Sequence, residues 1–74
     1  MKKRLSELSV GESCLVVCLL SEGSMRRRFL DIGICPGTRV LCVGRSPLGD
    51  PSAFLVRGTE VAIRRKDAAN IIIE

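Results

Sequence analysis

Short apolar segments separated by glycine and proline constrain the fold of this chain more than any other feature. The first covers residues 12–20, between Gly11 and Gly23, and has the apolar, β-branched content of a strand. Further β-like segments follow at residues 38–44, 53–57, 59–64 and 71–73. Five short strands with tight turns favour a small β-barrel over an open sheet, because closure removes exposed strand edges.

Glycine and proline also fix the expected turns. Pro36 and Gly37 suit the two central positions of a type II turn before the second strand. Gly58 leaves room only for a tight reversal, so the segments on either side of it should pair as an antiparallel hairpin. Pro47 and Pro51 fix the backbone φ angle at both ends of a loop between two strands, which should therefore be rigid.

One short helix is expected after the first strand. Ser24 offers an N-cap, and Gly33 offers a left-handed stop. Between them the apolar residues define one helical face, made of Met25, Phe29, Leu30 and Ile32. A helix of about nine residues does not persist alone in water, so it should dock against the strands through Phe29.

The two ends of the chain should complete the core. Leu5 and Leu8 form an apolar clip that can cover one end of the barrel, whereas residues 1–4 should be a frayed basic tail. Residues 66–70 indicate a single helical turn before the closing strand. We predict one contiguous core made of Val16, Phe29, Leu30, Val40, Phe54, Val61, Ile63 and Ile72.

Length and residue content narrow the range of functions. A chain of 74 residues holds a single domain, residues 1–74, and lacks the bulk to enclose a deep substrate chamber. It contains no histidine, the commonest general acid or base and the commonest metal ligand. No Gly-Lys-Ser/Thr phosphate loop occurs, and the glutamates show no paired spacing. We therefore expect no catalytic residues and no enzyme.

Four cysteines, at positions 14, 18, 35 and 42, raise the question of disulfides or a metal site. No export signal is recognised and no apolar run reaches about 18 residues, so a cytosolic location and free thiols are expected. Zinc is the alternative, but Cys14 and Cys18 fall in a β-like run that holds them about 13 Å apart, unlike the pairs of a zinc knuckle. We expect small buried thiols, with neither a bound metal nor a cofactor.

Nine of the twelve basic residues fall in three triplets, at residues 2–4, 26–28 and 64–66. The middle triplet, Arg26, Arg27 and Arg28, lies at the positive end of the expected helix dipole, so helix stability does not explain it. A solvated surface, an acidic protein partner or the anionic inner leaflet of a membrane would each suit such charge. Nucleic acid is not expected, because Phe54 is the only aromatic residue left to stack on a base.

Four blocks of residues, in a specific order and spacing, carry a family resemblance. They are Arg28-Phe29-Leu30-Asp31-Ile32-Gly33-Ile34, Pro36-Gly37-Thr38, Pro47-Leu48-Gly49-Asp50-Pro51 and Val61-Ala62-Ile63-Arg64-Arg65-Lys66-Asp67-Ala68. With Leu5, Leu8 and Gly11 before them, they make the chain resemble the FeoA family along essentially its whole length. Members of that family are small cytosolic proteins of bacterial ferrous iron transport.

The resemblance implies an SH3-like β-barrel with a helix inserted after the first strand, and no catalysis. It also implies an accessory or regulatory role in iron homeostasis, through contact with the cytosolic G-protein portion of the membrane iron transporter FeoB. A location at the inner face of the membrane, reached through this partner, would follow. The same barrel occurs as the terminal domain of iron-dependent repressors. The alternative is therefore a transcription-linked module that binds a peptide or nucleic acid.

The candidate partner surface combines two parts of the chain. The first is the arginine triplet, and the second is the loop with Leu48, Gly49 and Asp50. A stiff loop that exposes Leu48 at its tip would lower the ordering cost of docking. Asp50 is a weaker candidate for an iron ligand, because a single carboxylate without histidine makes at most a weak site.

Overall fold

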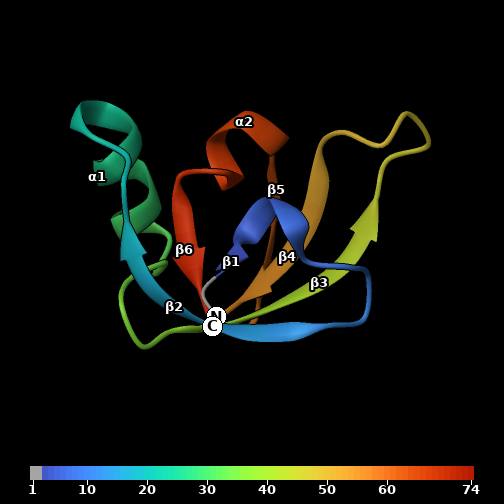
Figure 1. Cartoon of the computed structure of the whole chain (residues 1–74), viewed down its shortest axis with the longest axis horizontal. Helices are drawn as coiled ribbons and strands as arrows, with labels where there is room; N and C mark the ends of the chain where they lie inside the picture. Colours follow the sequence, from blue (N-terminus) through green and yellow to red (C-terminus); the bar gives the residue numbers. More distant parts are fainter. Residues whose placement is uncertain (1–2) are drawn as a thin grey trace.

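The computed structural model describes residues 3–74, which form one curved antiparallel sheet with helices at its rim (Figure 1). The elements are β1 (Lys3–Arg4), the 3-10 helix η1 (Leu5–Glu7), β2 (Ser13–Leu19), α1 (Gly23–Asp31), β3 (Arg39–Arg45), β4 (Ser52–Val56), β5 (Thr59–Ile63), α2 (Arg65–Ala68) and β6 (Ile71–Ile73). The strand order in the sheet is β1-β6-β2-β3-β4-β5, and every pair is antiparallel. The predicted class, mainly β with a short inserted helix, is confirmed.

Apolar side chains from β2 to β6, α1 and the N-terminal segment meet in one core. Most of the predicted members belong to it: Val16, Phe29, Val40, Phe54 and Ile63 are buried, and Val61 packs against the cluster. Leu5 and Leu8 are buried as well, so η1 covers one end of the sheet as predicted.

Two members of the predicted core are wrong. Leu30 is 41% exposed, because it lies about 100° around the helix from the buried Phe29. Ile72 is only half-buried, since side chains alternate along a strand and its neighbours Ile71 and Ile73 take the inward positions.

The prediction of a frayed tail is wrong for Lys3 and Arg4, which form β1 and pair with β6. Arg4 Nη1 also donates a hydrogen bond to Ala69 O (2.6 Å). This segment is held by a strand that lies almost the whole chain away in sequence, which local composition does not reveal. The rest of the predicted tail, residues 1–2, lies outside the described residues.

The helix begins before the predicted N-cap. Gly23 is the first residue of α1 and Glu22 occupies the N-cap position, so Ser24 lies within the first turn. Gly23 has a φ of 61°, a conformation that glycine adopts more readily than other residues, and this allows the chain to turn directly into the helix. Gly33, with a φ of 97°, follows the helix and stops it as predicted.

Both predicted turns are present. Residues 35–38 form the type II turn, in which Thr38 N donates to Cys35 O (2.9 Å) and Gly37 has a φ of 90°. The hairpin of β4 and β5 is antiparallel, but Arg57, predicted to end a strand, lies in the two-residue loop with a φ of 51°. Such loops usually require a positive φ at both central positions, and here these positions are Arg57 and Gly58.

The strand order leaves β5 at one edge of the sheet. β5 pairs with β4, and no other strand within residues 3–74 pairs with its second edge. The sheet thus curves around the core without a closing ladder along β5.

Candidate functional site: a cleft between α1 and β5

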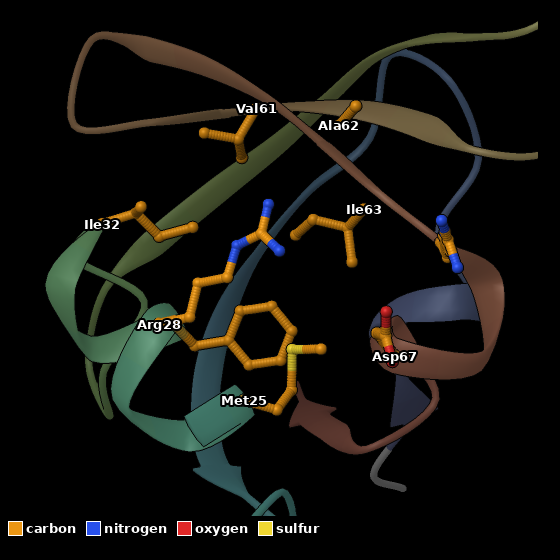
Figure 2. Close-up of a pocket in the computed structure, with 9 residues that line it drawn as sticks. Met25, Arg28, Ile32, Val61, Ala62, Ile63 and Asp67 are labelled. Carbon is orange, nitrogen blue, oxygen red and sulfur yellow. The ribbon is translucent and has the colours of Figure 1, made fainter. Parts of the chain in front are cut away.

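A cleft of about 520 Å³ separates α1 from β5 (Figure 2). We call it the α1–β5 cleft. Its walls come from segments that are distant in sequence. The lining residues are Met25, Arg28, Phe29 and Ile32 from α1 and its C-cap, Val61, Ala62, Ile63 and Arg64 from β5 and its end, and Asp67 from α2.

Helix and strand periodicity together give the cleft an apolar base. Met25, Phe29 and Ile32 share the face of α1 that packs on the sheet, because they follow the helical repeat. Val61 and Ile63 alternate with exposed residues on β5 and so point to one side of it. Phe29 is 3% exposed and fixes α1 to the core, and Ile63 is buried as well, whereas Met25, Ile32 and Val61 are only partly buried.

Arg28 is the charged side chain that crosses the cleft. It extends from α1 toward β5, among apolar side chains of both walls (Figure 2). Arg64 and Asp67 also line the cleft, so its lining includes two arginines and one aspartate. Arg26 donates from Nη1 to Leu19 O (3.4 Å), but no side-chain hydrogen bond within residues 3–74 involves Arg28. The donors of the Arg28 guanidinium are therefore not engaged by any other group in this part of the chain, and a guanidinium can bind a carboxylate through two hydrogen bonds.

The structure divides the predicted arginine triplet. Arg26 and Arg27 line a separate shallow hollow together with Leu30 and Asp31. Arg28 is the member that faces β5. Successive residues of a helix are turned by about 100°, so three neighbours do not share one face. Of the three arginines of the triplet, Arg28 alone lines the α1–β5 cleft.

The loop of residues 46–51 is closed by its own hydrogen bonds. Ser46 Oγ donates to Asp50 O (2.8 Å) and accepts from Asp50 N (3.1 Å), while Gly49 N donates to Ser46 O (2.8 Å). Asp50 Oδ1 accepts from Arg65 N at the start of α2 (2.9 Å). Leu48 is 94% exposed at the tip. The loop thus has an internal frame and presents one apolar side chain to solvent.

The two parts of the candidate partner surface are not contiguous. The loop lies on the far side of α2 from α1 (Figure 1). A partner that contacts both would have to extend over α2. The partner roles of Arg26, Arg27, Arg28, Leu48, Gly49 and Asp50 remain predictions.

The sequence analysis missed a set of polar contacts that joins the β4–β5 hairpin to the end of α1. Arg57 Nε donates to Gly33 O (3.3 Å), and its Nη2 donates to Cys35 Sγ (3.8 Å). Thr38 Oγ1 donates to Gly33 O (2.9 Å) and lies 3.1 Å from Cys35 Sγ. The available signal was the Arg57-Gly58 dipeptide, which as a two-residue loop turns Arg57 out of the strand. These contacts tie the two walls of the cleft together at one end.

The four thiols lie in two kinds of environment. Cys14 and Cys42 are buried as predicted, whereas Cys18 and Cys35 are partly exposed. The hydrogen bond with Thr38 lowers the pKa of Cys35, and burial raises the pKa of Cys14. Within residues 3–74 we find no group of three or more side chains with metal-ligating atoms placed to share an ion.

Comparison with known proteins identifies the family. The model of the FeoA domain matches residues 3–74. The chain belongs to the FeoA family. A relative from Porphyromonas gingivalis, a fusion of Fe(2+) transport protein A with the Fe(2+) transporter FeoB, is 37% identical over 71 residues. That match covers 96% of this chain and 8% of the fusion protein. The family is linked to ferrous iron transport, and in this relative a FeoA domain is joined to FeoB.

Solved FeoA structures share the fold. A FeoA-like protein from Clostridium acetobutylicum superposes with a TM-score of 0.89 at 32% identity, covering 99% of this chain and 85% of its own. FeoA from Stenotrophomonas maltophilia was solved with zinc and is described as a prokaryotic SH3 domain protein. It superposes with a TM-score of 0.85 at 27% identity, covering 96% of this chain and 88% of its own. The predicted SH3-like fold is confirmed. No helix within residues 3–74 has the length and apolar character needed to cross a membrane.

Proposed function

We propose that this FeoA-family chain is an accessory protein of ferrous iron uptake that binds the cytosolic G-protein region of a FeoB-type transporter through the α1–β5 cleft. The observation that carries the proposal is Arg28, which lies over the apolar base of the cleft and makes no side-chain hydrogen bond within residues 3–74. The fusion found in Porphyromonas gingivalis supports the choice of partner, because joining two domains raises their effective concentration for each other.

The chemistry of the cleft suits recognition of a protein surface. Arginine surrounded by apolar side chains is a common anchor of binding, since it combines a directed charge with stem packing. Met25 and Ile32 are only partly buried, so they offer apolar area to a partner on either side of Arg28. The role is regulatory contact rather than catalysis, and any nucleotide chemistry belongs to the partner.

A cytosolic location at the inner face of the membrane follows from this partner. Arg26 and Arg27 lie on a part of α1 that does not face the cleft, where Arg27 and the donors of Arg26 not bonded to Leu19 O offer positive charge to anionic lipid headgroups. Each basic residue near such a surface contributes about 1 kcal/mol. The exposed Leu48 offers a second, separate contact on the far side of α2.

Calorimetric titration of the chain with the purified cytosolic region of the FeoB-type transporter from the same organism tests the proposal. Arg28→Glu should weaken binding at least about tenfold, because a carboxylate then faces the acidic group that the guanidinium met. Arg27→Glu, one position away and outside the cleft, is the matched control and should change affinity by less than about threefold. Leu48→Ser measures the separate contribution of the loop.

Circular dichroism melting of each variant shows whether it folds, which separates loss of contact from loss of structure. No measurable binding by the folded parent chain would overturn the proposal. Equal weakening by Arg27→Glu and Arg28→Glu would instead assign the effect to general charge attraction.

A further inference from the structure

The second edge of β5 borders the α1–β5 cleft. Four successive residues, Val61, Ala62, Ile63 and Arg64, all line it. Side chains alternate between the two faces of a strand, so a hollow that touches every residue of a run must also touch the backbone edge. The cleft is therefore bounded on one side by peptide groups as well as by side chains.

These peptide groups have no strand partner within the described chain. β5 pairs with β4 along its first edge only, and no backbone hydrogen bond outside that ladder engages residues 59–63. The other edge strand, β1, is two residues long, and such a short strand is a poor template for pairing. β5 is five residues long, and three of its residues, Val61 to Ile63, border the cleft of about 520 Å³.

The geometry points to strand addition: we propose that the α1–β5 cleft binds an extended acidic segment of a partner protein, which pairs with the free edge of β5. This inference rests on the proposed function for the identity of the partner and adds the way in which the partner is held. An extended segment rises about 3.3 Å per residue, so four or five residues match the length of β5.

Backbone hydrogen bonding distinguishes this occupant from a helix. An occupant that covers the cleft removes water from the edge of β5, and any peptide group left unpaired there then costs free energy. A helix uses its own backbone groups internally and has none to offer. An extended segment supplies an N–H or C=O group at alternate positions, so it satisfies the edge that it covers.

Charge selects an acidic segment. Arg28 and Arg64 line the cleft against the single carboxylate of Asp67, and the whole chain carries a formal charge of +4. A second copy of the chain would bring like charge to this site, which disfavours it as the occupant. In a segment that alternates apolar and acidic residues, one face carries all the carboxylates, and that face would turn toward Arg28 and Arg64.

Residue-resolved amide exchange tests the inference. The chain is mixed first with the cytosolic region of the FeoB-type transporter, and separately with a blocked octapeptide of alternating valine and glutamate. With both probes, alternate amides within residues 59–63 should slow at least about tenfold, while the remaining amides, already bonded to β4, should not change. The Arg28→Glu chain should lose the effect, and the Arg27→Glu chain should keep it.

Two peptide controls isolate the backbone contribution. N-methylation of the valine amides removes donors along one edge of the peptide, and N-methylation of the glutamate amides removes them along the other. Only one of the two modified peptides should lose affinity, by at least about tenfold.

The possible outcomes separate the two proposals. If the transporter region fails to bind but the octapeptide protects alternate β5 amides, the strand-addition site stands and the transporter assignment fails. If the transporter region binds with unchanged exchange along β5, strand addition is wrong and the proposed function stands. Equal loss for both methylated peptides, or no protection of β5 by either probe, also overturns strand addition.

Discussion

The α1–β5 cleft and the loop of residues 46–51 differ in how they use their polar groups. In the loop, Ser46 and Asp50 pair with each other, and Asp50 also caps α2 through Arg65 N. In the cleft, Arg28 and the second edge of β5 have no such partners within residues 3–74. Because its polar groups are already paired, the loop offers a partner only its shape and the apolar side chain of Leu48. A surface with unpaired groups can select a ligand by hydrogen bonding and charge.

The two regions are also held in place by different means. The loop is fixed locally, by contacts among residues within five positions of each other and one bond to α2. The cleft depends on long-range packing of Phe29 and on the contact of Arg57 with the end of α1. Changes beneath the cleft should therefore cost far more than changes in the loop.

The largest expected effect comes from Phe29→Ala. This side chain is buried and joins α1 to the sheet, so its removal should lower the free energy of unfolding by about 3 to 5 kcal/mol. Leu30→Ala, at the neighbouring exposed position, should cost less than about 1 kcal/mol. Urea unfolding followed by circular dichroism measures both values. Similar costs at the two positions would mean that α1 is not docked through Phe29.

A smaller effect is expected where the hairpin meets α1. Gly33 and Gly37 both have positive φ, so alanine at either position should cost about 1 to 3 kcal/mol in backbone strain. At Gly33 the new Cβ would also lie 2.6 Å from Arg57 Cδ, whereas at Gly37 no atom lies within 4 Å. Gly33→Ala should therefore destabilise more, because the Arg57 side chain must move and lose its bond to Gly33 O.

An Arg57→Ala background checks this reason. Thermal melting in that background should bring the costs of Gly33→Ala and Gly37→Ala together, because the side chain that clashes is gone. If Gly33→Ala still destabilises the chain more than Gly37→Ala in that background, Arg57 is not the reason for the larger loss of stability at Gly33.

In the loop, Asp50→Ala removes the acceptor for Arg65 N and should cost about 1 kcal/mol, a fall of roughly 4 to 8 °C in melting temperature. Asp50→Asn keeps an oxygen at this position and should retain most of the stability.

Leu48→Ser should leave the melting temperature unchanged, since the side chain is almost fully exposed. Calorimetric melting of the three variants ranks them, and a large loss for Leu48→Ser would contradict the description of the loop.

The last prediction concerns the chemical reactivity of the thiols, which should affect the stability of the fold least. The pKa of Cys35 is lowered by its hydrogen bond with Thr38, so alkylation by iodoacetamide should reach half its maximal rate at a lower pH than for an ordinary thiol. Cys14, whose pKa is raised by burial, should react slowly throughout. Mass spectrometry of digests taken across a pH series measures each site.

Thr38→Val is the control, because it removes the hydroxyl group that lowers the pKa of Cys35. The pH at which alkylation of Cys35 reaches half its maximal rate should then rise. The sign of the linkage follows from the lowered pKa. Ionisation of Cys35 favours the folded chain above the unfolded-state pKa, and this contribution disappears as the pH falls through the folded-state value. A midpoint that Thr38→Val leaves unchanged would show that another group controls the thiol.

The sequence by itself determined the local features of this protein. Short apolar segments between glycine and proline specified the strands, Gly33 and Gly37 specified the positive φ angles that stop α1 and turn the chain into β3, and Phe29 specified the buried side of the helix. Each of these depends on the conformations open to a residue and its near neighbours. The ordered blocks of residues were also sufficient to recognise the family, which the match over residues 3–74 confirms.

Only the tertiary structure decided where these elements meet. It paired Lys3 and Arg4 with β6, set Arg28 apart from Arg26 and Arg27, and left the second edge of β5 without a strand partner among residues 3–74. No local preference encodes such placements. They depend on which buried faces pack together and on which backbone groups find partners when the whole sheet curves around its core.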